Sequence, residues 1–327
     1  MNNKFLKSAA SLNGNALINT IGIIFLVSVI LFSSCAKKRA DDKKTLPNYV
    51  SASSFYSTYQ QPEQTFTVDT PGTAPIIGKE GTILSGWDSI FMYPTGQSIS
   101  YPFTLKLVEV YTLKDMILSN LPPIASGKIL ESGGEIRIRA FKGATELVLK
   151  PGKKYSMLLD TSKTPLLNGM SVYYGAPNGT ITDWTNNVTI LDPSINPDNL
   201  SAVINTPAQA YLMHIARMGW VNCARQFSSS AGTTTISFTS QGTNTQNIDV
   251  FLVFKNIHSM MQVYNLTSQP IPVGTNLTVV AISRDSNQNN AMAYEAQDIT
   301  VTAGMQVTLN LASITDANLL GQLAGYK

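Results

Sequence analysis

The sequence predicts an all-β fold, with two tandem antiparallel β-sandwich-like domains and a short C-terminal helix. Apolar and polar residues alternate over several short segments, as they do in strands with one buried face. Glycine and proline clusters separate these segments at intervals typical of turns. Only 13% of the residues are charged, while Thr, Ser and Asn are abundant. This composition favours β domains with hydroxyl-rich outer faces.

Residues 1–34 have the three regions of a secretory signal peptide. Lys4 and Lys7 precede an apolar run over residues 21–32, and two small residues follow it. This run is shorter than the roughly 18 apolar residues that a membrane-spanning helix needs. The exit, Phe32-Ser33-Ser34-Cys35, resembles the lipobox of bacterial lipoproteins, which implies cleavage before Cys35 and acylation of its thiol. The alternative is an uncleaved helix with an incidental cysteine.

Lipidation would hold Cys35 at a membrane through several acyl chains, because one chain alone binds only marginally. Ala36 follows the cysteine, and the absence of Asp there favours the outer membrane over the inner one. Residues 35–62 contain no sustained apolar period, so we expect a lipidated, flexible tether. The charges between Lys37 and Lys44 are interpreted as a solvated part of it, with a headgroup or export signal as the alternative.

The mature chain would be close to neutral. Removing residues 1–34 leaves 21 of the 23 basic residues beside 20 acidic ones, so we expect no nucleic-acid partner. Cys35 and Cys223 are the only cysteines. Acylation of Cys35 would therefore leave Cys223 without a partner for an intrachain disulfide.

Residues 63–165 are predicted to form the first β-sandwich domain. Strands are expected at 103–107, 135–139, 147–149 and 155–159. The expected turns are Pro94-Thr95-Gly96, Ser132-Gly133-Gly134 and Pro151-Gly152. One helical turn is expected between Thr112 and Ser119, with Thr112 or Asp115 near its N-terminus.

Residues 166–208 are rich in Pro, Gly and Asn, and they predict an irregular packed connection. Residues 209–327 are predicted to form the second β-sandwich domain. Its strands are expected at 235–239, 250–254, 277–282 and 307–311, with a turn at Pro272-Val273-Gly274. The runs at 250–254 and 277–282 are continuously apolar, which indicates coverage on both faces. Leu319, Leu320 and Leu323 share one face of a closing helix within 316–326.

Residues 80–160 resemble a module of Bacteroidota-type secreted lipoproteins, from Gram-negative bacteria that use surface glycans. The resemblance is carried by Glu80-Gly81-Thr82, residues 105–111, Lys114-Asp115-Met116-Ile117, Ser132-Gly133-Gly134-Glu135-Ile136, Leu147 and Leu149. More distantly, the region is similar to ZU5-type β-sandwiches, with Tyr93-Pro94-Thr95-Gly96 in place of their usual Pro-Pro-Gly-Ala turn. The resemblance implies a β-sandwich fold and no particular activity.

The sequence holds no recognisable catalytic set, so we expect no enzyme and no cofactor. His214 and His258 are the only histidines, which excludes zinc sites built on several histidines. His214 and Cys223 are a candidate thiol dyad, but a buried structural cysteine is the preferred interpretation. Three carboxylates are candidates for a hydrolase, although nothing in the sequence pairs them: Glu109, Asp115 and Glu135.

Asp285, Asn287 and Asn289 have the 1-3-5 spacing of a calcium loop. Asn290 stands where such a loop has glycine, and Ala296 stands where it has Glu. A polar hairpin tip is therefore the preferred interpretation, and no metal site is predicted.

Trp87 and Trp184 are candidate binding side chains, because an indole ring can stack on a sugar ring. Tyr93 and Trp220 are further aromatic candidates of the same kind. For each of them a place in the core is the alternative.

The sequence thus predicts a noncatalytic lipoprotein of the outer membrane, which acts in binding or as a structural component. Surface glycan is one expected ligand, and an exposed aromatic platform would support it. The alternative is a protein–protein component of an envelope export or adhesion assembly, which an exposed apolar patch or open sheet edge would support. A hydrolase is the third hypothesis and requires carboxylates gathered in a cleft. The sequence leaves open whether the protein faces the periplasm or the cell surface.

Overall fold

The computed structural model describes residues 45–326 apart from 73, 165, 179–180 and 188–199. The signal segment 1–34 and Cys35 lie outside the described residues. The chain divides into two units, residues 1–45 and 46–327, and the second unit contains all the described helices and strands. Strands make up 47% of the described residues, and helices, including the short 3₁₀ turns, make up 11%, which confirms the all-β class.

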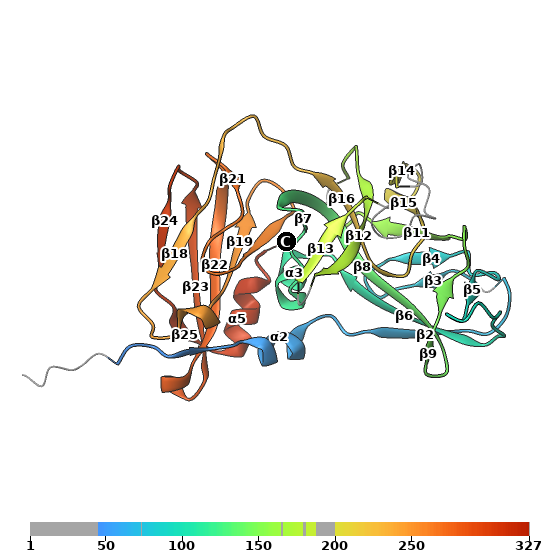
Figure 1. Ribbon diagram of the computed structural model, residues 1–327, viewed down its shortest axis with the longest axis horizontal. Coiled ribbons are helices and arrows are strands. Elements are labelled where there is room, and N and C mark those ends of the chain that lie inside the picture. Colours follow the sequence, from blue (N-terminus) through green and yellow to red (C-terminus); the bar gives the residue numbers. More distant parts are fainter. Residues whose placement is uncertain (1–44, 73, 165, 179–180, 188–199, 327) are drawn as a thin grey trace, which may run out of the picture. The chain divides into compact units, whose positions relative to one another are not determined.

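Among the described residues, the largest sheet has eight strands, in the order β13-β12-β16-β8-β6-β2, with β7 and β9 paired to β8 (Figure 1). All of its pairs are antiparallel. The strands are β2 (Gln64–Val68), β6 (Phe103–Val110), β7 (Ile124–Ala125), β8 (Lys128–Lys142), β9 (Thr145–Glu146), β12 (Ser171–Asn178), β13 (Ile181–Thr185) and β16 (Gly219–Gln226).

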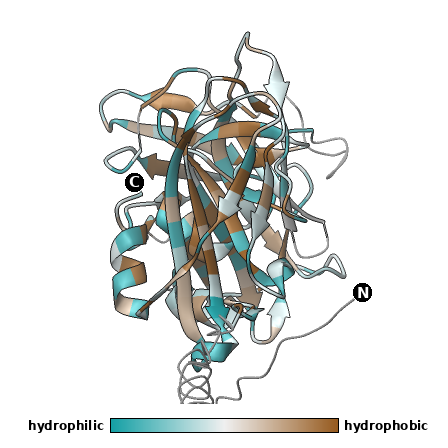
Figure 2. Ribbon diagram, turned by 90° about the vertical axis from the view of Figure 1, so that its left-hand side faces the viewer, coloured by the Kyte–Doolittle hydropathy of each residue, from teal (hydrophilic) through white to brown (hydrophobic). Residues whose placement is uncertain are grey.

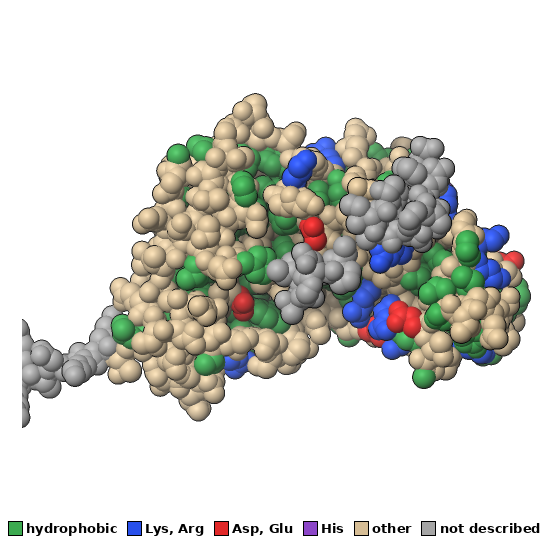
Figure 3. Space-filling view, in the orientation of Figure 1, with side chains coloured by type: hydrophobic (Ala, Val, Ile, Leu, Met, Phe, Trp, Pro, Cys, Tyr) green, Lys and Arg blue, Asp and Glu red, His purple; other side chains and the backbone are tan. Residues whose placement is uncertain are grey.

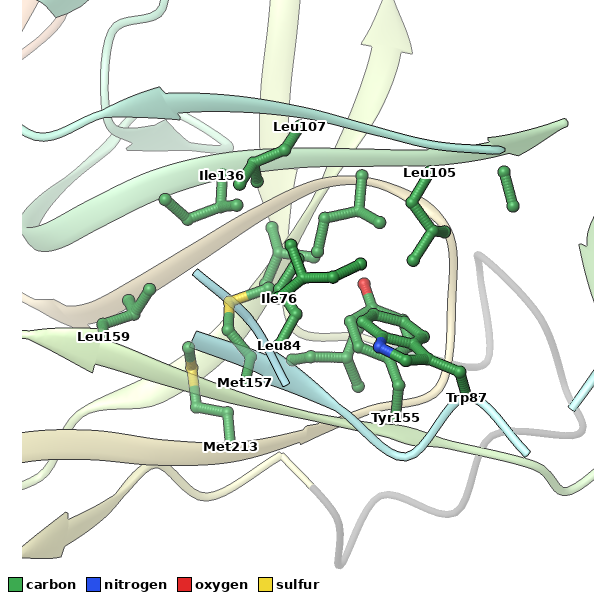
Figure 4. Close-up of a cluster of buried hydrophobic side chains, with 14 of the residues drawn as sticks. Ile76, Leu84, Trp87, Leu105, Leu107, Ile136, Tyr155, Met157, Leu159 and Met213 are labelled. Atoms are coloured by element: carbon green, nitrogen blue, oxygen red, sulfur yellow. The ribbon is translucent and has the colours of Figure 1, made fainter. Parts of the chain in front are cut away.

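A five-stranded sheet, in the order β14-β15-β11-β4-β3, completes the first sandwich. Its strands are β3 (Ile76–Ile77), β4 (Ile83–Ser85), β11 (Tyr155–Asp160), β14 (Val203–Asn205) and β15 (Ala210–Ile215), and a separate pair joins β5 (Phe91–Met92) to β10 (Val148–Leu149). Alternate side chains of both sheets form one apolar cluster. Figure 4 shows Leu105, Leu107 and Ile136 of the large sheet above Leu84 and Met157 of the smaller one.

The second sandwich is built on a six-stranded sheet, in the order β20-β19-β22-β23-β25, with β1 paired to β22. Its strands are β1 (Tyr49–Val50), β19 (Asp249–Phe254), β20 (Met260–Val263), β22 (Asn276–Asp285), β23 (Ala291–Thr300) and β25 (Ala312–Ile314). Two short pairs accompany it: β17 (Thr233–Thr234) with β21 (Ile271–Pro272), and β18 (Ser237–Ser240) with β24 (Gln306–Leu309). The β18–β24 pair is parallel, an exception to the antiparallel expectation. Figure 2 faces this sandwich and shows hydrophobic segments, in brown, along its strands.

The predicted helices are confirmed. Helix α3 (Leu113–Ser119) begins after Thr112, whose hydroxyl accepts a hydrogen bond from the Asp115 backbone N–H at 3.1 Å, as an N-cap does. Helix α5 (Asp316–Leu323) closes the chain with Leu319 and Leu323 buried. Helix α2 (Ser53–Tyr59) was not expected, because residues 35–62 were assigned to the tether.

A third apolar cluster contains residues of α2, α3 and α5 together with residues of both sandwiches. Val108 and Val110 come from β6, while Phe251 and Val253 come from β19. Val250 and Leu252, the alternate residues of β19, lie in the core of the second sandwich. The expectation that the run 250–254 is covered on both faces is therefore confirmed.

Strand pairing corrects the expected domain limits. β15 pairs with β11 and β16 pairs with β8, so residues 210–226 belong to the first sandwich, although the sequence assigned them to the second. In contrast, β1 pairs with β22, so residues expected in the tether join the second sandwich. The connection 166–208 contains β12, β13 and β14. Local alternation identifies strands but cannot show which distant strand each one joins.

Ser132-Gly133-Gly134 was expected to be a turn, and this prediction is wrong. The segment lies inside β8, where Gly133 and Gly134 together oppose Cys223 of β16, so they form a β-bulge. Gly134 has φ +131°, and a Cβ there would lie 2.8 Å from the Tyr111 ring. Glycine is needed here because a strand bends against an aromatic ring.

Candidate functional site

The two tryptophans expected to bind sugars are core residues. Trp87 is 4% exposed, and its ring stacks on that of Tyr155 with 5.4 Å between centroids (Figure 4). Trp184 is fully buried, and its indole N–H donates to the Pro122 carbonyl oxygen at 3.0 Å. Neither ring is free at the surface, so the prediction of Trp87 and Trp184 as binding side chains is wrong. Each tryptophan was a candidate because of its residue type alone, and its packing in the core leaves no ring face for a sugar.

The residues with calcium-loop spacing form the turn between β22 and β23, which confirms the hairpin interpretation. The Asp285 carboxylate accepts from the Asn287 backbone N–H at 2.9 Å, at the start of the 3₁₀ turn η3 (Ser286–Gln288). The Asn287 amide donates to the Leu46 carbonyl oxygen at 2.7 Å, and Asn289 ends the turn with φ 56°. Among the described residues, no cluster of three or more His, Cys, Asp or Glu is arranged to hold a metal.

His214 and Cys223 do not form a dyad. Cys223 is fully buried in β16, and burial raises the pKa of its thiol. His214 lies exposed on β15, with its Nδ1 3.2 Å from the Ser156 hydroxyl. The interpretation of Cys223 as a buried structural cysteine is confirmed.

The three candidate carboxylates have separate structural partners. Glu109 is buried and accepts from the backbone N–H groups of Glu80 and Thr82. Asp115 accepts from the Thr112 hydroxyl at the start of α3. Glu135 is fully buried, and burial raises its pKa well above the ordinary value. These contacts give no cleft in which two of the carboxylates act together.

A polar cleft of about 440 Å³ opens where the outer face of the large sheet meets α2 and α3. We call it the Trp220 cleft. Its lining residues are Ser57, Thr58, Gln60, Gln61, Pro62, Glu63, Val108, Ser119, Asn120, Leu121, Arg137 and Trp220.

Trp220 and Arg137 are cross-strand neighbours in the pairing of β16 with β8. The Arg137 guanidinium lies over the half-buried indole ring, 5.3 Å from a ring centroid. Its Nη2 donates to Glu63 at 3.1 Å, and Glu63 also accepts from Lys106 at 2.8 Å. Burial by itself would raise the pKa of Glu63, but the hydrogen bond and charge of Lys106, together with Arg137 and Arg139, lower it. The cleft thus holds an ionised carboxylate between fixed cations.

Two polar atoms of the lining residues are buried without a hydrogen-bond partner in the described part of the chain: Arg137 Nε and Asn120 Oδ1. Arg137 Nε is a donor, and the Asn120 amide oxygen is an acceptor. Asn120 caps α3 in the left-handed conformation, with φ 55°. An unpaired buried polar group costs about 1–3 kcal/mol, so these two atoms add to the cost of folding the wall of the cleft.

The chemistry of this lining suits a polyhydroxylated ligand. Gln60, Gln61 and Asn120 offer amides, Ser57 and Ser119 offer hydroxyls, and Trp220 adds an aromatic edge. Binding sites commonly combine an apolar surface with a few directed polar groups of this kind.

The sequence presents Trp220 as one aromatic among several and gives no sign of its neighbours. The alternation around Arg137 indicated only that this side chain faces water. Trp220 lies far along the chain from Arg137, and only the β8–β16 register brings the two together. No local pattern signals that pairing.

Neither a protein-family model nor a curated protein matches the chain. Within the described residues, no helix is long and apolar enough to span a membrane.

Proposed function

We propose that the protein is a lipoprotein anchored in the outer membrane through Cys35, and that it binds a glycan in the Trp220 cleft without cleaving it. The lipobox-like Phe32-Ser33-Ser34-Cys35 and the preceding apolar run support the anchor. The observation that carries the binding role is the cleft itself, where an indole, a guanidinium and several amides converge.

Two features of the cleft support a sugar ligand over a purely apolar one. Its lining is mostly polar. A sugar hydroxyl both donates and accepts, so it suits a lining that combines donors such as the Arg137 guanidinium with acceptors such as side-chain amide oxygens. The separate roles of Glu109, Asp115 and Glu135 favour binding without hydrolysis, because a glycosidase requires two cooperating carboxylates.

The anchor is tested by mass spectrometry of the full-length protein isolated from Gram-negative membranes. We expect a chain that begins at Cys35 and carries the mass of the acyl groups, and a C35S variant that lacks this mass. A native protein with residues 1–34 attached and an unmodified thiol would refute the anchor.

The binding role is tested by screening the detergent-solubilised protein against an array of bacterial and host glycans. We expect W220A to lose at least ten-fold in affinity, about 1.4 kcal/mol. N120G should weaken binding while keeping the left-handed backbone, because glycine accepts this conformation and removes only the amide. Bound oligosaccharides should be recovered unshortened. Wild-type protein that binds no glycan, or W220A that binds as tightly as wild type, would refute the role.

A second candidate is a component of an envelope assembly, favoured by the edges of the five-stranded sheet. Val203 of β14 is 59% exposed, and Ile77 of β3 is 63% exposed. Exposed apolar residues on edge strands suit pairing with another protein. Stoichiometric co-purification of partners that V203D and I77D abolish, with glycan binding absent, would support this candidate over the first.

A further inference from the structure

A row of cations continues from the Trp220 cleft along the outer face of β6 and β8. Arg137 and Arg139 are alternate residues of β8, so both point away from the core. Lys106 of β6 lies opposite Arg139 in the strand register. The side chains of these three residues are 33–34% exposed. The row is therefore accessible to a ligand that extends out of the cleft.

Aromatic rings and carboxylates hold these cations in fixed positions. Arg139 and Lys106 both lie over the Phe141 ring, at 4.7 and 5.1 Å from its centroid. Arg139 is also held by a two-point contact with Glu146, at 2.8 and 2.7 Å. Because their side chains are already ordered, these cations lose little conformational entropy when they bind an anion.

Positive charge exceeds negative charge on this face. Three cations, Lys106, Arg137 and Arg139, lie beside two carboxylates, Glu63 and Glu146. Figure 3 shows the blue side chains gathered beside red ones over β6 and β8. The mature chain as a whole would be nearly neutral, so this excess is a local feature.

We infer that the ligand of the Trp220 cleft is an acidic glycan, whose carboxylate or sulfate groups contact Lys106 and Arg139. This inference rests on the proposed function. Alternate residues of one strand are separated by roughly 6–7 Å, so an anionic group at Arg139 and Lys106 lies about one sugar beyond the part of the ligand at Arg137. A neutral glycan would use the cleft and gain nothing from the row.

The test compares polygalacturonate with the same polymer after methyl esterification, which removes the charge and keeps the backbone. Dextran sulfate, with neutral dextran as its control, separates sulfate from carboxylate recognition. Binding of the full-length, detergent-solubilised protein is measured by calorimetry at low and high salt. We expect the acidic form of one pair to bind at least ten-fold more tightly than its neutral form, with the difference shrinking as salt rises.

K106Q and R139Q should each weaken binding of the acidic polymer roughly three-fold, as expected for partly exposed ion pairs. R139Q, whose side chain does not line the cleft, should leave binding of the neutral form unchanged. K153Q, at an exposed turn away from the row, is the matched control and should have no effect. Equal affinity for acidic and neutral polymers, with K106Q and R139Q unchanged, would overturn the inference and leave the proposed function standing. If the wild-type protein binds no glycan at all, this result would instead refute the proposed function.

Discussion

One strand, β8, passes through two regions with opposite environments. Residues 129–136 are buried without interruption, whereas from Arg137 onward buried residues alternate with half-buried ones. In the first region the backbone of Ser132 also bonds to the loop between β19 and β20, through its N–H and the His258 carbonyl at 2.9 Å. In the second region Ile138 and Ala140 face the core, while Arg137 and Arg139 face outward.

The polar residues of β8 have different roles because one region of the strand is covered by other elements and the other is open. In the covered region the Asn222 side chain accepts from the Ser132 hydroxyl and donates to Glu135. Their hydrogen bonds serve the fold. In the open region Arg137 and Arg139 are held by partners yet remain accessible, so they can serve a ligand. The same strand therefore supplies a structural element and a candidate binding face.

The largest effect is expected in the covered region, at Gly134. A G134A substitution puts a Cβ 2.8 Å from the Tyr111 ring, at φ +131°, and overpacking and backbone strain together should cost about 3 kcal/mol. Urea unfolding of both proteins measures this. The matched control is G152A, at φ +71° with nothing within 4 Å of its Cβ, which should cost about 1 kcal/mol. Equal losses in the two variants would show that the bulge is not tightly packed.

A smaller loss is expected for S132A. The Ser132 hydroxyl donates to the Asn222 side-chain oxygen at 2.8 Å and accepts from the Gly134 N–H at 3.1 Å. Its removal leaves two buried groups unpaired, so we expect about 1–3 kcal/mol of destabilisation in the same unfolding assay. The stability of S162A, at an exposed surface position, should stay within about 0.5 kcal/mol of wild type. If S162A lost as much stability as S132A, the effect of S132A could not be assigned to the buried hydrogen bonds.

Glu135 should make stability depend on pH. Burial raises its pKa in the folded protein well above 4.5, so the folded state holds a proton that the unfolded state releases. The stability that protonated Glu135 contributes is fully present below about pH 4.5, and it is lost as pH rises toward the pKa of Glu135 in the folded protein. The melting temperature of wild type should therefore fall relative to that of E135Q between pH 5 and 8. Burial lowers the pKa of His258, but this histidine is common to both proteins and cancels in the difference. Parallel pH profiles would contradict the prediction.

The smallest effect is expected in the open region. The pKa of Arg139 is raised, chiefly by its hydrogen bond to Glu146. E146Q removes this partner. The pair is partly exposed, so stability should change by less than about 1 kcal/mol. Affinity for an acidic polymer should instead rise slightly, because one competing carboxylate is gone. A large loss of stability would show that the Arg139–Glu146 pair has a structural role instead of a binding role.

The sequence by itself determined the features that are encoded within a few residues. Alternation located the central strands, Thr112 marked the start of α3, and Leu319 and Leu323 identified the closing helix. The continuous apolar run at 250–254 correctly indicated a strand covered on both faces. These patterns follow from the backbone geometry of each element, which repeats every two or 3.6 residues.

Only the tertiary structure decided the pairing of distant segments. It buried Trp87 and Trp184, turned Gly133-Gly134 into a bulge within β8, and set Trp220 beside Arg137. Register between such strands is fixed by how whole faces pack against a core, and the burial of an aromatic ring depends on which sheet covers it. No short segment carries that information, so the candidate site became visible only when the strands were paired.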